Sequence, residues 1–397
     1  MSIEAILKPI LAKLSNVNKH QRTFLTELFS VLLGRQGRAT FENLARYARF
    51  TELTFRRHFA TYFDWMAFNK ACIDFTQGSF IGIVDCSFIP KSGTKTFGLD
   101  KFWSSCAGKA QRGLEVSVLA CVNTLTKQCF ALEASQTPPN ITQHDDKPYS
   151  RLSWYVEQIA DCLPHLPALL YWVADGYYAK REVFTLFVKH HRHLITRLRH
   201  DAALYHLWTK GRQPGQLGPT RRYDGKAVFD NLARWQDEGL HPIHAHIALY
   251  SALLYSKHFE RSLRVLLLLD TRTQKYVLLA STDQQQSASQ IAYYYHLRFQ
   301  IELLFRDAKQ FTGLNQCQAR NDAKLDYHLN ATLSAVNVSR LLLAADASLF
   351  NSMNALVRRE TNRRIWKTIY TQLSEEGSVD VNRLDSLNCQ FWQRRAA

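Results

Sequence analysis

The hydrophobic pattern of the chain changes its period at Gly78. No glycine or proline occurs in residues 38–77, and apolar side chains there recur at helical spacing. The positions that carry this helical pattern are Phe41, Leu44, Ala45, Ala48, Phe55, Phe59 and Phe63. Beyond Gly78, apolar residues gather in short runs typical of strands, at residues 80–88, 115–123 and 128–134. A chain of this kind begins with helices and continues in a sheet.

The succession of elements after these three strands narrows the fold class. A helical stretch at residues 151–162 precedes an apolar strand at 168–174. A second helix near 180–189 then precedes a strand at 193–198. The order is β-β-β-α-β-α-β, so we expect an α/β protein with an RNase H-like mixed sheet flanked by helices.

A segment with several glycines and prolines interrupts this α/β pattern. Residues 210–226 include Arg212, Arg221 and Arg222 and predict a flexible basic loop. The strand-like runs that follow are residues 243–255, 264–270 and 275–281. We therefore expect residues 199–286 to form a β-rich insertion in the core.

Helices are expected to complete the chain. Ser287 and Gln290 have the spacing of a capping box that opens a long helix, and Gly313 is a suitable residue to end it. Helical periodicity returns at residues 329–345 and 352–373. The last helix is basic through Arg358, Arg359, Arg363, Arg364 and Lys367. It therefore suits contact with a polyanion or a second protomer, and packing on the rest of the chain is the alternative.

The charge of the chain favours a polyanionic partner. Its 50 Lys and Arg residues outnumber its 34 Asp and Glu residues, which gives a net charge of +16. Near the N-terminus, Thr40 and Thr51 are the expected N-caps of two short helices, and the second helix exposes Arg56, Arg57 and His58. This outline fits a DNA-binding helix-turn-helix, with a plain helical bundle as the alternative.

Several other classes of protein are disfavoured. No apolar run approaches the ~18 residues of a membrane helix, and Glu4 and Lys8 interrupt the apolar N-terminal segment. We therefore expect a cytoplasmic protein. The eight cysteines include no C-x2-C pair, and His241, His244 and His246 lack a Cys or Glu to complete a metal pattern, so we expect a solvated strand there.

Two aspartates stand at the ends of apolar strands. Asp85 follows Ile-Gly-Ile-Val, and Asp175 follows Trp-Val-Ala and precedes a glycine. An apolar strand is a poor place for a carboxylate unless something pairs with it, although Asp-Gly is also a common turn dipeptide. Just beyond Asp85, Lys91 and Lys95 flank a Ser-Gly-Thr loop that either grips phosphate or forms a polar turn.

The predicted helix after Ser287 carries a narrow polar stripe. Its members are spaced by 3, 4, 4 and 3 residues and are Tyr295, Arg298, Glu302, Arg306 and Lys309. The rest of the helix is mostly apolar, so it should be largely buried. A ladder of salt bridges on a solvated face is the alternative.

These residues carry a resemblance to a known family. The pattern Tyr295-x2-Arg298-x3-Glu302-x6-Lys309 resembles the Y-R-E-K signature of bacterial insertion-sequence transposases of the DDE type. The Asp-Gly-Tyr-Tyr segment at Asp175 is similar to the segment around the second aspartate of that family. The resemblance runs from about residue 85 to residue 318 and implies an RNase H-like catalytic core with a β-rich insertion.

The resemblance also implies a metal-dependent chemistry. Asp85, Asp175 and Glu302 would be the catalytic residues and the ligands of two Mg2+ ions, for which Mn2+ can substitute. DNA would be held by Tyr295, Arg298, Arg306, Lys309, Lys91, Lys95, Arg56 and Arg57.

We accordingly expect a DNA transposase made of five regions. They are a helical DNA-binding domain at 1–77, the first part of the core at 78–198, the insertion at 199–286, the second part of the core at 287–349 and a basic helical region at 350–397. The expected partner is double-stranded DNA, both the terminal inverted repeats of the element and the target, bound by a homodimer. The alternatives are a nuclease or resolvase without strand transfer, and a domesticated, non-catalytic DNA-binding protein.

Overall fold

A computed structural model describes residues 2–376, apart from residues 140, 142, 145–146, 213–214, 216, 220 and 346–351. Within this part of the chain the fold is mixed α/β, with one sheet of twelve mostly antiparallel strands. None of the described helices combines the length and the apolar character that a bilayer crossing requires.

One half of the sheet contains the strands that the sequence predicts after Gly78. They are β1 (Phe80–Pro90), β3 (Lys109–Asn123), β4 (Cys129–Gln136), β7 (Tyr171–Ala174) and β8 (His193–Leu198). β3 pairs antiparallel with both β1 and β4, whereas β1, β7 and β8 run parallel to one another. The helices α6 (Arg151–Cys162) and α7 (Arg181–Lys189) occur where the sequence places them, so the predicted order of elements is confirmed.

One short strand is not predicted from the sequence. β2 (Asp100–Ser104) pairs with the beginning of β3 and makes it longer than expected. β2 is only five residues long and contains just two large apolar residues, Phe102 and Trp103, so periodicity alone does not detect it. Two further strands of two residues each, β5 (Gln143–His144) and β6 (Lys147–Pro148), form a separate ribbon.

The strands of the predicted insertion extend the same sheet. β14 (Tyr276–Ser281) pairs antiparallel with β8, and the sheet continues through the other strands. These are β9 (Leu204–Leu207), β10 (Tyr223–Lys226), β11 (Gln236–Leu240), β12 (Ile247–Ser256) and β13 (Arg261–Asp270). β12 begins four residues later than predicted, because Nδ1 of His241 accepts the N–H groups of Ile243 and His244 and holds a turn there.

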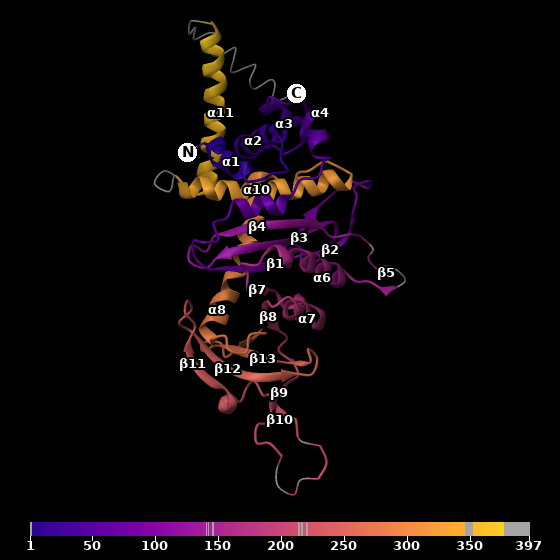
Figure 1. Ribbon diagram of the computed structural model, residues 1–397, viewed down its shortest axis with the longest axis vertical. Coiled ribbons are helices and arrows are strands. Elements are labelled where there is room, and N and C mark those ends of the chain that lie inside the picture. Colours follow the sequence, from indigo (N-terminus) through magenta and orange to yellow (C-terminus); the bar gives the residue numbers. More distant parts are fainter. Residues whose placement is uncertain are drawn as a thin grey trace.

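Five helices precede the sheet, and a long helix joins them to it. They are α1 (Ile3–Ala12), α2 (Lys19–Gly34), α3 (Phe41–Tyr47), α4 (Glu52–His58) and α5 (Trp65–Ala71). The side chains of Thr40 and Thr51 cap α3 and α4, as predicted. Figure 1 shows α10 (Asp322–Ala345) lying between these helices and β4.

Two buried asparagines of α10 protect the free edge of β4. The amide of Asn337 accepts from the Ala131 N–H at 2.9 Å and donates to the Ala131 carbonyl at 2.8 Å. Asn330 makes the same pair of bonds with Ala134. The main chain of β4 is thus hydrogen-bonded on both sides, and the sheet edge is covered by a helix.

The long polar-striped helix is not continuous. It divides into α8 (Ala288–Leu297) and α9 (Gln300–Asp307), followed by a π-helical turn, η4 (Ala308–Thr312), that ends at Gly313 in the left-handed region. Ser287 caps α8 through the Gln290 N–H, but the Gln290 side chain bonds Tyr294, so only half of the expected capping box forms. The last described helix is α11 (Met353–Glu376).

Candidate active site

Asp85 and Asp175 lie side by side where the parallel pairing of β1 with β7 ends. Val84 of β1 is in register with Ala174 of β7, and an aspartate follows each of them. Asp175 comes directly after the last residue of β7, whereas β1 continues past Asp85 to Pro90 in pairing with β3, so the prediction that Asp85 ends its strand was wrong. Neighbouring strands of a sheet lie about 4.8 Å apart, so the main chains at Asp85 and Asp175 are next to each other. Gly82 permits this pairing, because a Cβ at that position would lie 2.3 Å from the ring of Trp172.

The Asp85 carboxylate is mostly shielded from solvent, with 19% of its side chain exposed. Its Oδ1 accepts the N–H of Cys86 at 2.8 Å. The pKa of Asp85 is raised to about 7, first by burial and then by the Asp175 carboxylate, while the Arg298 guanidinium opposes the shift. A carboxyl group in this position gains strongly from a nearby cation.

Arg298 supplies such a cation and links Asp85 to Glu302. Its Nη1 lies 3.2 Å from Oδ2 of Asp85, and its Nη2 lies 2.7 Å from Oε1 of Glu302. Burial lowers the pKa of Arg298, but the nearby Asp85, Tyr295 and Glu302 outweigh that effect and raise it. The contact between Arg298 and Glu302 follows from helical spacing, whereas the contact with Asp85, 213 residues away, could not be read from the sequence.

The break between α8 and α9 falls at this arginine. The N–H of Arg298 donates to the carbonyl of Tyr295, and the N–H of Glu302 donates to that of Phe299, which are tighter three-residue steps. Phe299 is thereby left 52% exposed. Tyr295 is partly buried near Arg298 and Asp175, and burial raises its pKa. Tyr295, Arg298, Glu302, Asp85 and Asp175 therefore gather at one place.

Asp175 is oriented by its own backbone. Its Oδ1 accepts the Tyr177 N–H at 2.9 Å and caps the short 3-10 helix η2 (Gly176–Tyr178). Its carbonyl accepts the Thr196 hydroxyl at 2.7 Å, which ties the end of β7 to β8. Within the described part of the chain, no group of three or more His, Cys, Asp or Glu side chains is arranged to hold a metal ion.

The other basic residues of the stripe differ in their surroundings. Arg306 is exposed and pairs with the neighbouring Asp307 at 3.0 Å. Lys309 lies on the π-helical turn, and partial burial lowers its pKa. Lys91 donates to the Cys317 carbonyl and burial lowers its pKa as well, whereas Lys95 is exposed in the loop after β1. Lys91 would have to leave Cys317 to contact a phosphate.

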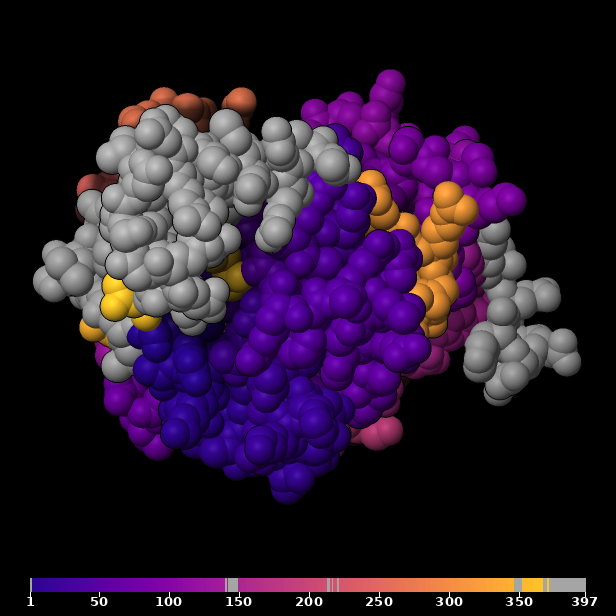
Figure 2. Space-filling view, turned by 90° about the horizontal axis from the view of Figure 1, so that it is seen from above, coloured from indigo at the N-terminus to yellow at the C-terminus, as the bar shows by residue number. Residues whose placement is uncertain are grey.

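The basic residues predicted on the N-terminal helices lie on α4. Arg57 is exposed, and Arg56 is half-exposed while its Nε donates to Glu52 at 2.7 Å. His58 stacks on Phe24 with ring centroids 3.8 Å apart, so it is not a free surface group. Figure 2 shows that the N-terminal helices form much of the surface at this end of the molecule. Among the basic residues predicted near the C-terminus, the side chain of Lys367 lies outside the part of the chain that the structure describes. All of residues 377–397 lie outside it as well.

The prediction of a solvated strand at the three histidines was wrong. Residues 241–246 form the turn before β12, and His241 is only 6% exposed. His244 packs between His241 and His246, and His296 of α8 joins them, 5.3 Å from His244 between ring centroids. Burial and the neighbouring imidazoles lower the pKa of His241 to about 4, so this ring is neutral near pH 7.

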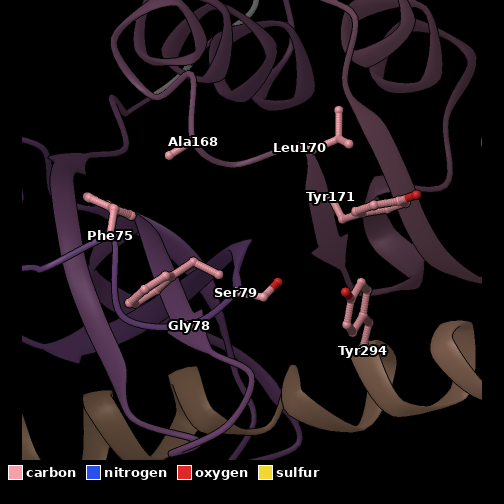
Figure 3. Close-up of a pocket in the computed structure, with 8 residues that line it drawn as sticks. Phe75, Gly78, Ser79, Ala168, Leu170, Tyr171 and Tyr294 are labelled. Atoms are coloured by element: carbon pink, nitrogen blue, oxygen red, sulfur yellow. The ribbon is translucent and has the colours of Figure 1, made fainter.

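A cavity of about 200 Å³ lies at the opposite ends of the same strands. Figure 3 shows its aromatic lining, in which Tyr171 and Tyr294 face the segment around Phe75 and Ser79. The Tyr171 hydroxyl donates to Asp283 at 2.7 Å. Because β1 and β7 are parallel, residues at their amino ends lie away from Asp85 and Asp175, so this cavity is separate from the carboxylates.

A comparison with known protein families identifies the class. Residues 77–338 match the family described as the transposase DDE domain, which is 262 of the 397 residues of the chain. The chain therefore belongs to the transposase DDE domain family, whose members are enzymes that cleave and move DNA. A search among curated proteins found no match.

Proposed function

We propose that this protein is a DDE transposase that binds the terminal inverted repeats of its element, cleaves DNA with Mg2+ and joins the freed end to target DNA. The observation that carries the proposal is the side-by-side position of Asp85 and Asp175, with Glu302 linked to Asp85 through Arg298. The pairing β4-β3-β1-β7-β8, antiparallel and then parallel, supports an RNase H-like core.

The chemistry of the donor set suits a hard divalent cation, although the three carboxylates are not arranged as a metal site in this structure and would have to converge to share one. Asp85, Asp175 and Glu302 offer only carboxylate oxygens, and the guanidinium between Asp85 and Glu302 already occupies the position of a cation. We assign these three residues as the ligands of two Mg2+ ions, or of Mn2+ in their place. When bound, such ions would activate the attacking oxygen and stabilise the leaving oxygen.

The stripe residues would hold the DNA backbone. Arg298 would leave the carboxylates when they take up a cation, and its fork would then bind a phosphate next to the scissile one. Tyr295 would add a hydroxyl contact to the DNA backbone beside Arg298. Together with Glu302 and Lys309, these two residues make up the Y-R-E-K signature. Arg306 and Lys309 would contact the DNA backbone further along.

The remaining regions would recognise and pair the DNA ends. We assign residues 1–77 to sequence reading, with Arg56 and Arg57 of α4 facing DNA, and Lys91 and Lys95 to a phosphate contact beside the core. The core would comprise 78–198 and 287–349, with 199–286 as its insertion and 350–397 as a basic C-terminal region. Synchronised cutting of two ends favours a homodimer.

A strand-transfer assay tests this function against its alternatives. The protein, Mg2+ and a duplex that carries one end of the element should yield nicked ends and then products joined to a target plasmid. Nicking without joining would instead indicate a nuclease or resolvase. Binding without either reaction would indicate a domesticated DNA-binding protein.

A further inference from the structure

A hairpin extends from the sheet beyond the end of β1. Pro90, the last residue of β1, is paired with Gly113 of β3, and residues Lys109–Gly113 of β3 continue past it in pairing with β2. Across the hairpin, Lys101 is in register with Arg112, and Trp103 is in register with Ala110. These four side chains share one face of the ribbon.

The opposite face of the hairpin is anchored to the protein. Phe102 is fully buried, and the guanidinium of Arg151 from α6 lies 4.3 Å from the centre of its ring. The same arginine pairs with Asp100 at 2.7 Å. The hairpin is therefore held firmly on one side, which fixes the direction of the other.

The free face combines two cations with an indole. Trp103 is 63% exposed, and both Lys101 and Arg112 are exposed. Like charges opposite each other in a strand pair destabilise it. No carboxylate among the described residues forms an ion pair with either cation, so their charges are not compensated within this part of the chain. A polyanion would compensate them.

The hairpin lies on the same strand pair as the candidate active site. The strand that carries Arg112 continues to Val118, which is in register with Asp85, so Arg112 and Asp85 are roughly 20 Å apart along the strands. Cys106, in the turn of the hairpin, is near enough to Lys309 to influence its ionisation electrostatically. A duplex lying across the carboxylates would therefore continue over the exposed face of the hairpin.

We propose that Lys101, Trp103 and Arg112 form a docking surface for the duplex DNA that flanks the cleaved phosphodiester. The inference rests on the proposed function, since it requires DNA at Asp85. Lys101 and Arg112 would each bind a phosphate, and the indole of Trp103 would lie against the sugars and base edges between them. The charge on this face favours DNA over a protein partner, which would need an acidic surface of its own.

Salt-dependent binding of a 40-base-pair random-sequence duplex provides the first test. For the full-length Lys101→Ala/Arg112→Ala variant, the slope of log K against log salt should become shallower by about 1.8, which is ~0.9 for each lost phosphate contact. The matched control, Lys189→Ala/Lys275→Ala, removes two exposed lysines outside the hairpin and should keep the wild-type slope. An unchanged slope in the hairpin variant, or an equal change in the control, would overturn the proposal.

The indole is tested separately. Trp103→Ala should weaken binding of the same duplex by roughly tenfold with little change in salt slope, because an apolar contact releases no counterions. Trp103→Phe should restore most of the affinity. Wild-type affinity for Trp103→Ala would exclude the indole from the surface, and equal losses for both variants would contradict an aromatic contact.

Proximity can be measured from Cys106, which is exposed in the turn of the hairpin. An iron chelate attached to Cys106 in a Cys389→Ser protein should cleave a bound duplex, whereas the same chelate on Lys189→Cys in a Cys106→Ser/Cys389→Ser background should not. If the chelate on Cys106 does not cleave the bound duplex while the wild-type protein still cuts DNA, the docking surface is contradicted and the proposed function is not. An Asp85→Asn protein that retains cleavage would instead refute the proposed function.

Discussion

At the scale of single residues, Arg298 is the group whose position is most informative. Its guanidinium contacts both Asp85 and Glu302, so it competes with any metal ion that those carboxylates would bind. Arg298→Ala should therefore bind Mn2+ roughly three- to tenfold more tightly in the absence of DNA, yet cleave DNA more slowly because a phosphate contact is lost. Electron paramagnetic resonance of free Mn2+ measures the affinity. The control is Arg306→Ala, which removes an exposed charge of the same helix and should leave Mn2+ binding unchanged. Unchanged or weaker Mn2+ binding by Arg298→Ala would contradict the competition between Arg298 and the metal ion.

At the scale of elements, the pairing of β1 with β7 positions both aspartates. Gly82→Ala would drive a methyl group into the ring of Trp172, with 2.3 Å between Cβ and the nearest ring atom. We expect a loss of roughly 1–3 kcal/mol in the free energy of unfolding, measured by urea denaturation, together with slower cleavage as Asp175 shifts. Gly93→Ala is the control, since its Cβ would meet only the Thr96 hydroxyl at 3.4 Å. Equal stability of the two variants would show that the close approach at Gly82 does not constrain the strands.

At the scale of the whole molecule, α10 connects the N-terminal helices to the sheet and contains a buried histidine. Burial lowers the pKa of His328 to about 3, and Arg35 and Lys91 act in the same direction, whereas its hydrogen bond with the Gly313 carbonyl opposes the shift. The folded state holds this ring neutral, while the unfolded chain protonates it below about pH 6.5. Its contribution to stability is therefore present above pH 6.5 and is lost as pH falls toward the folded pKa, by about 2 kcal/mol at pH 5. His328→Gln should lose correspondingly less stability between pH 7 and pH 5 in urea titrations, and identical losses in both proteins would contradict this role.

Local patterns predicted most of the elements and picked out the residues of the candidate site, but not the contacts between them. The apolar runs before Asp85 and Asp175 indicated strands, although β1 continues past Asp85 to Pro90, and the spacing of Tyr295, Arg298 and Glu302 indicated one helical stripe. The break in that helix, the ion pair between Arg298 and Asp85, and the turn that gathers the histidines depend on tertiary packing that periodicity does not encode. The hairpin of β2 is not predicted because the strand is only five residues long and contains just two large apolar residues.

The central claim is that Asp85, together with Asp175 and Glu302, holds the metal ions that cleave DNA. An Asp85→Cys variant tests it most directly, because a thiolate is a poor ligand for Mg2+ and a better one for Mn2+. Cleavage of a duplex carrying one element end should be abolished in Mg2+ and partly restored in Mn2+, while binding of that duplex stays close to wild type. Full activity of Asp85→Cys in Mg2+ would contradict the claim.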